Sequence, residues 1–95
     1  MAKKELEMDF EDLKKNILSG NVTIGSDTVL KSLKLGNLSK VFLASNCALK
    51  IREEIEHLAQ ISNTPLIILT LSNEELGVLC KKNFFVATIG INGAS

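Results

Sequence analysis

The chain has 95 residues, of which 45% are apolar and 23% charged, a balance that fits one globular domain and argues against a disordered segment. Eleven lysines and arginines offset eleven aspartates and glutamates, so the formal net charge is zero and avid nonspecific binding to nucleic acid is disfavoured. Any nucleic acid must therefore contact a local patch. With four phenylalanines and neither tryptophan nor tyrosine, a platform that stacks single strands is also disfavoured.

The first two helices are predicted from apolar periodicity. One covers Glu5 to Ser19 and ends at Gly20, a residue suited to a left-handed cap. The second begins at Ser26 or Asp27, both favourable capping residues, and stops at Gly36. Between them, NVTIG fits a short strand. The side chains predicted to face inward are Leu6, Phe10, Leu13 and Ile17 from the first helix, then Val29, Leu30 and Leu33 from the second.

Two apolar runs flank the third predicted helix. KVFLAS (Lys40 to Ser45) and LIILTL (Leu66 to Leu71) fit strands that are covered on both faces. The helix between them covers Ala48 to Ser62 and ends before Pro65, which disfavours helical geometry in the preceding residue. Its predicted inward residues are Ile51, Ile55, Leu58, Ala59 and Ile61.

A capping box predicts the fourth helix. Ser72 and Glu75 have the required spacing, and Leu76, Leu79 and Cys80 follow on one face. FFVATIGI then fits a final strand, in which one of the two leading rings faces in and the other out. The alternation of helices and strands predicts one sheet, largely parallel or mixed, with helices on both faces.

The cysteines and the single histidine are weak candidates for chemistry. Cys47 and Cys80 form no CxxC pair and adjoin apolar positions, so we interpret them as small core residues rather than nucleophiles. Glu54 and His57 share a helix face, but metal sites of that kind need a second copy of the motif. We therefore expect no metal and no cofactor. MAKKELEMDF lacks the apolar core of a secretory signal, and no run is long enough to span a membrane, so a cytoplasmic protein with reduced thiols is expected.

Three loops could instead contact a ligand. Gly25 and Ser26 precede a helix, where free amides can hold a phosphate, although ordinary capping explains them equally well. Asn46 follows a buried strand and could read a base edge, or it could cap the third helix. KKNFF (residues 81–85) combines cations with rings, a pairing useful for RNA, or it solvates a loop before a core strand. Sequence spacing does not fix whether these loops share one edge of the sheet.

These stretches together resemble a known family. TIGSDTVLKSLKLGNLSKVFLASNCALKIREEIEHLAQISNTPLIIL, followed by SNEELGVLCKKNFFVATIGI, resembles the kink-turn-binding ribosomal proteins of archaea and eukaryotes, closest to the large-subunit branch numbered thirty. The resemblance covers about Leu13 to Ile91 and implies a three-layer α/β/α sandwich with a mixed four-stranded sheet. From the chain length we expect residues 1–95 to form a single domain. The resemblance also implies that Glu75-Leu76-Gly77 forms the family's turn ELG. The RNA-binding residues that it implies are Gly25, Ser26, Asp27, Thr28, Lys31, Asn46, Lys81, Lys82 and Phe84.

The function implied by the resemblance is noncatalytic. We expect a structural component of the large ribosomal subunit that recognises a sharply bent RNA, with ribosomal RNA and neighbouring ribosomal proteins as partners and no small-molecule substrate. The alternatives are a kink-turn-binding protein of another ribonucleoprotein, and a protein-interaction module on the same fold. Two departures from the family pattern matter: Asp27 is acidic where relatives often carry Lys or Asn, and Lys81 stands where relatives commonly have glycine, which predicts a different loop path.

Overall fold

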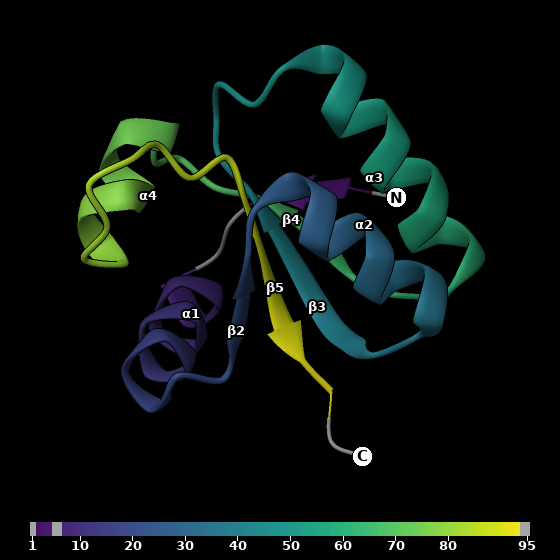
Figure 1. Cartoon of the computed structure of the whole chain (residues 1–95), viewed down its shortest axis with the longest axis horizontal. Helices are drawn as coiled ribbons and strands as arrows, with labels where there is room; N and C mark the ends of the chain where they lie inside the picture. Colours follow the sequence, from purple (N-terminus) through teal and green to yellow (C-terminus); the bar gives the residue numbers. More distant parts are fainter. Residues whose placement is uncertain (1, 5–6, 94–95) are drawn as a thin grey trace.

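Helices alternate with strands in the computed structural model, which describes residues 2–4 and 7–93, with side chains described from residue 9 onward (Figure 1). The predicted alternation is confirmed, and no described helix is long and apolar enough to cross a membrane. The elements are β1 (Ala2–Lys4), α1 (Glu7–Ser19), β2 (Val22–Ile24), α2 (Ser26–Leu35), β3 (Leu38–Leu43), α3 (Leu49–Ile61), β4 (Leu66–Ile68), α4 (Asn73–Leu79) and β5 (Thr88–Asn92).

The sheet is mixed, as predicted, and its order is β1-β4-β3-β5-β2. β3 pairs with β4 in parallel, whereas β5 runs antiparallel to both β3 and β2. The strand β1, parallel to β4 at one edge, was not predicted, so the sheet has five strands where four were expected. The sequence AKK is too short to show the alternation of apolar and polar residues that predicts a strand. The segment is a strand because it pairs with the edge of β4.

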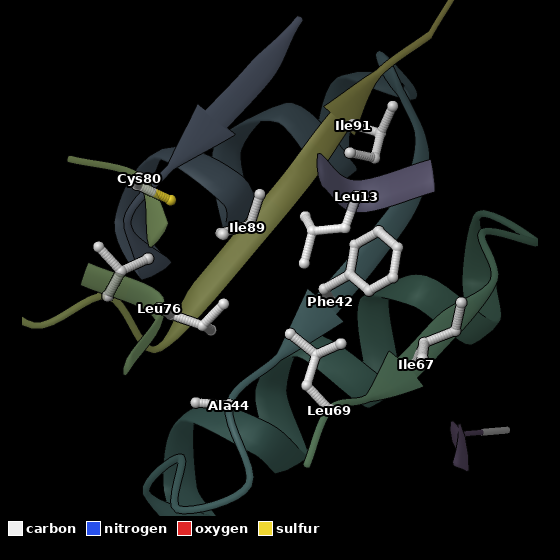
Figure 2. Packing of buried hydrophobic residues seen from close by; sticks show 10 residues of the cluster. Leu13, Phe42, Ala44, Ile67, Leu69, Leu76, Cys80, Ile89 and Ile91 are labelled. Carbon is white, nitrogen blue, oxygen red and sulfur yellow. The ribbon is translucent and has the colours of Figure 1, made fainter. Parts of the chain in front are cut away.

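Two separate cores lie on the two faces of the sheet. One is covered by α1 and α4, and Figure 2 shows Leu13 and Leu76 from these helices converging on Phe42 and Ile89 of the sheet. The other is covered by α2 and α3, which contribute Val29, Leu33, Ile55 and Ala59. These inward residues match the predicted stripes. Leu6 and Glu5, the predicted start of the first helix, lie outside the described residues.

Glycines end the first two helices as predicted. Gly20 has φ 75°, and Gly36 has φ 72° with its amide donating to the carbonyl of Leu33, so both adopt the left-handed conformation that closes a helix. The capping box of α4 is also confirmed: the Ser72 hydroxyl accepts from the Glu75 amide, and the Glu75 carboxylate accepts from the Ser72 amide. The capping residues in the sequence therefore predicted the ends of α1 and α2 and the start of α4 correctly.

Three predictions near the ends of elements are wrong. Ile61 was expected inside but is 66% exposed, because it lies in the last turn of α3, beyond the packed face. The final strand begins at Thr88, not at Phe84. Phe84 and Phe85 therefore lie in a loop, where side chains need not alternate between the two faces of a sheet, and both rings are exposed. The ELG motif lies inside α4 and forms no turn, because the capping box already starts the helix at Asn73.

Candidate nucleic-acid interface

The three candidate loops converge at one end of the sheet (Figure 1). Gly25 follows the end of β2, and Asn46 follows the end of β3. β5 is antiparallel to both strands, so its start lies beside their ends: Ile24 is level with Ile89, and Leu43 with Thr88. The loop that leads into β5 therefore reaches the same edge, which sequence spacing could not establish.

The start of β5 joins two of these loops. Thr88 is fully buried, and its hydroxyl lies 3.0 Å from that of Ser26, while its carbonyl accepts a 3.1 Å hydrogen bond from the amide of Gly25. The residue before it, Ala87, accepts a 2.9 Å hydrogen bond from the amide of Ala44, just after the end of β3. The start of β5 thus holds both the start of α2 and the beginning of the loop after β3.

The start of α2 is open. Its N-cap is Gly25, which corrects the expectation of a Ser26 or Asp27 cap, and no side chain caps the helix. Gly25 has φ 106°, a conformation that side chains rarely adopt, although an added Cβ would meet no atom closer than 3.9 Å. Among the described residues the amides of Ser26, Asp27 and Thr28 have no acceptor, so they can serve an external anion.

Asn46 does not cap α3, whose N-cap is Ala48 without a side-chain hydrogen bond. Instead it pairs with Asn73 at the start of α4. The Asn46 Nδ2 donates to Asn73 Oδ1 at 3.1 Å, and the amide of Asn73 donates to Asn46 Oδ1 at 2.8 Å. An amide side chain offers two donors and two acceptor lone pairs, so one donor and one acceptor of the exposed Asn46 stay available.

The loop after α4 is fixed by backbone contacts. Lys81 has φ 58°, its amide donates to Val78 and that of Lys82 to Gly77, which together form a Schellman motif. Lys81 itself thus adopts the left-handed conformation that favours glycine. That this loop follows a different path from that of relatives stays a prediction. Further along, a Cβ on Gly77 would lie 2.3 Å from the carbonyl oxygen of Phe84, so the loop lies directly on the helix.

Both rings of this loop are accessible. Phe84 is 54% exposed and Phe85 is 66% exposed, and they line a shallow pocket of about 150 Å³ with Val78 and Lys82. The amide of Val86 donates to the carbonyl of Asn73, which connects the loop to the partner of Asn46. Phe84 is thereby held on the same side of the molecule as Asn46 and Gly25.

Six exposed lysines make no ion pair with any described residue: Lys15 on α1, and Lys31, Lys34, Lys50, Lys81 and Lys82. Lys31 lies on the second turn of α2, and Lys50 lies in the first turn of α3. Lys81 and Lys82 are one α4 length, about 10 Å at 1.5 Å per residue, from the Asn46–Asn73 pair. Both lysines are thus distant from this pair, although Lys82 lines the shallow pocket beside Phe84.

The thiols are unsuited to nucleophilic chemistry. Burial raises the pKa of Cys47 above its ordinary value, against smaller lowering effects from Thr88 and Arg52. Burial also raises the pKa of Cys80, against the opposing charge of Lys82. Both thiols are therefore protonated at neutral pH, as expected of core residues. His57 is exposed, and the described residues contain no cluster of three or more metal-binding side chains.

Three contributors to this edge were missed in the sequence. Thr88 gave a weak signal, a hydroxyl inside an apolar strand pattern. Asn73 was recognised only as part of a capping box, because its pairing with Asn46 depends on strand order. Lys50 gave a clearer signal: a cation in the first turn of a helix opposes the macrodipole, so it has a cost to stability that a function could explain.

Comparisons with known proteins give one consistent result. A family model described as the ribosomal protein L7Ae/L30e/S12e/Gadd45 family matches residues 10–95. The large ribosomal subunit protein eL30 of Candida albicans is 39% identical over 75 residues, covering 79% of this chain and 71% of that protein. The eL30 of Methanopyrus kandleri is 34% identical over 73 residues, covering 77% and 67%.

Solved structures support the fold. The Giardia lamblia 15.5kD RNA binding protein superposes with a TM-score of 0.74 at 21% identity, covering 96% of this chain and 78% of that one. A protein of unknown function from Bacillus halodurans gives a TM-score of 0.76 at 18% identity, covering 86% and 81%. The predicted three-layer α/β architecture is therefore confirmed.

Proposed function

Since the chain belongs to the ribosomal protein L7Ae/L30e/S12e/Gadd45 family, we propose that it is a noncatalytic RNA-binding component of the large ribosomal subunit in the cytoplasm, and that it recognises a kink-turn-like bent RNA. The relatives are named as proteins of the large ribosomal subunit, which supports a structural and non-enzymatic role. The observation that carries the proposal is the juxtaposition of Gly25, Asn46 and Phe84 at one edge, linked through Thr88 and Asn73.

The N-termini of α2 and α3 provide local positive potential even though the net charge of the chain is zero. Neither α2 nor α3 has a side-chain cap, so each presents free amides and the positive end of its macrodipole at this edge. The start of α4 is different, because Ser72, Glu75 and Asn46 satisfy its amides. In our proposal the phosphates of the bent strand lie over α2 and α3, with Lys31 and Lys50 beside them.

Asn46 supplies the sequence-reading contact in this proposal. One donor and one acceptor are free after pairing with Asn73, and a purine edge can use both at once. The pairing also fixes the orientation of the amide before RNA arrives. Less side-chain freedom is then lost on binding, which favours affinity.

Phe84 supplies an apolar surface for a base that leaves the stack. An exposed ring on a loop held against α4 can cover an unstacked base without reorganising the backbone. Lys82 and Glu74 both line the shallow pocket that contains Phe84, so a phosphate is favoured only on the Lys82 side. Lys81 contributes through the backbone conformation that aims the loop.

Asp27 favours a second candidate function, protein interaction on the same fold. It is exposed in the first turn of α2, where it complements the helix dipole but repels phosphate. A pull-down that recovers protein partners and is insensitive to nuclease would favour this function.

Salt-resolved binding to a bent RNA and to a straight duplex of equal length tests the proposal. The bent RNA should bind more tightly at every salt concentration, because shape is being read as well as charge. Lys50→Ala should reduce the salt slope by about 0.7–0.9, the value for one lost phosphate contact. Lys15→Ala is the matched control: Lys15 is exposed on α1, which covers the other face, and its loss should leave the slope unchanged.

A further inference from the structure

The two faces of the sheet are covered differently. On one face α2 and α3 pack directly against each other, whereas on the other α1 and α4 make no comparable contact among the described residues. Figure 1 shows the same contrast, with α1 and α4 as separate bodies. Between them is an open hollow of about 400 Å³, which we call the α1–α4 hollow; it is lined by Phe10, Leu71, Glu74, Glu75, Val78 and Leu79.

The floor of the α1–α4 hollow is apolar and accessible. Val78 is 73% exposed, and Phe10, Leu71 and Leu79 are each partly exposed rather than buried in the core. The volume has room for about two leucine-sized side chains, given that about 150 Å³ accepts a benzene-sized molecule. A contiguous apolar hollow on a protein surface indicates a site of interaction.

The rim is acidic. Glu74 makes no hydrogen bond or ion pair with another described residue, and Glu75 uses one carboxylate oxygen in the capping box. No cation lines the hollow among the residues whose side chains the structure describes. Lys14, whose ammonium lies 4.9 Å from the Phe10 ring centre, is paired with Glu11 at 3.9 Å. Phosphates of RNA and the headgroups of anionic lipids would both be repelled here.

We propose that the α1–α4 hollow binds a basic amphipathic helix of a protein partner. Apolar side chains at i, i+3, i+4 and i+7 of that helix enter the hollow, and its lysines or arginines meet Glu74 and Glu75. This combination of an apolar floor and a negative rim selects a cationic peptide over RNA, lipid and acidic peptides. The α1–α4 hollow adjoins the shallow pocket beside Phe84, because Glu74 and Val78 line both. Binding of the basic helix is argued from the hollow alone and does not depend on the RNA-binding function.

A designed peptide tests this assignment with the 95-residue chain and no RNA. The probe carries leucines on one helical face and lysines elsewhere, and its counterpart has glutamate at every lysine position. Titration followed by two-dimensional NMR should move the amide resonances of α4 and of Phe10 for the basic peptide alone. Binding of the acidic peptide with equal affinity, or shifts confined to α2 and α3, would overturn the proposal.

Matched variants sharpen the test. Val78→Asp should weaken the basic peptide about tenfold or more, as loss of a central apolar contact does at interfaces. Leu35→Asp is the control, since Leu35 is also 73% exposed but lies on α2. Equal weakening by both variants would contradict the site.

Glu74→Lys tests the acidic rim. It should lower the affinity for the basic peptide and raise the affinity for the acidic one; an unchanged preference would refute the role of the rim. Circular dichroism checks that each variant is folded.

Discussion

Asn46 and Asn73, far apart in the chain, hold each other through two hydrogen bonds of 3.1 and 2.8 Å. The pair joins the loop after β3 to the start of α4, and the carbonyl of Asn73 in turn accepts from Val86 in the loop that carries the exposed rings. An asparagine that seemed to be either a cap or a ligand-binding residue thus has a third role. It accepts a hydrogen bond from the first amide of α4 instead of capping α3, and one donor and one acceptor of its side chain stay free.

The pair predicts that stability and RNA binding can be separated at position 46. Asn46→Asp keeps the acceptor for the Asn73 amide and places a carboxylate at a helix start. The bond from Asn46 Nδ2 is lost, but the Asn73 side-chain amide can turn and donate to the new carboxylate, so the free energy of unfolding should change by less than about 0.5 kcal/mol. The donor to the base is lost and the carboxylate repels phosphate, so RNA affinity should fall. Urea melts and titration with bent RNA measure the two effects. A large loss of stability with unchanged affinity would contradict the assignment.

Lys81 predicts a stabilising substitution. Its φ of 58° is unfavourable for any residue with a Cβ, and glycine removes that cost, so Lys81→Gly should raise the free energy of unfolding by about 1 kcal/mol. Lys82→Gly is the control, because Lys82 lacks a positive φ and only gains freedom when unfolded. Denaturant unfolding distinguishes them. The account is wrong if Lys81→Gly destabilises the protein as much as Lys82→Gly does.

Gly77 predicts a reversal of the usual helix rule. Alanine for glycine inside a helix normally stabilises by about 0.5–1 kcal/mol. Here the new methyl group would lie 2.3 Å from the carbonyl oxygen of Phe84, so Gly77→Ala should instead destabilise by about 1–3 kcal/mol. It should also weaken RNA binding by displacing the loop. Val78→Ala, at the exposed neighbouring position, should change stability little; stabilisation by Gly77→Ala would refute the close contact.

The cysteines predict a loss of stability at alkaline pH. Burial raises the pKa of Cys47 and of Cys80 above the ordinary 9.0 in the folded state. Above that pH the unfolded chain releases thiol protons before the folded chain does, so the free energy of unfolding decreases as pH rises. Their stabilising contribution is fully present below pH 9. Thermal melts should show a smaller alkaline decrease for a Cys47→Ala, Cys80→Ala double variant; an identical decrease would argue against this cause.

Regular elements and their caps were predictable because the signals are local. The stripe that contains Leu13, the glycine at position 36 and the Ser72–Glu75 box each lie within a few residues of the boundary that they determine. β1 was missed because its short sequence carries no pattern of its own and its pairing depends on the edge of β4.

The candidate site was predictable in its residues more than in its connections. Gly25 and Asn46 stand out as loop residues after strands, and the resemblance to the family added Phe84. Their convergence depends on the placement of β5 between β3 and β2, which is a property of the whole sheet. For the same reason the buried hydroxyl of Thr88 and the pairing of Asn73 could not be foreseen, since both contacts join residues distant in the chain.

The central claim is that Asn46 reads a bent RNA, and its most direct test is the affinity of the wild type and of Asn46→Ala for a kink-turn RNA and for a straight duplex of equal length at one salt concentration. The wild type should prefer the kink-turn, and Asn46→Ala should lose about 1–3 kcal/mol of binding to it while binding the straight duplex unchanged. Equal affinity of the wild type for the two RNAs, or an Asn46→Ala variant that keeps its full preference, would contradict the account.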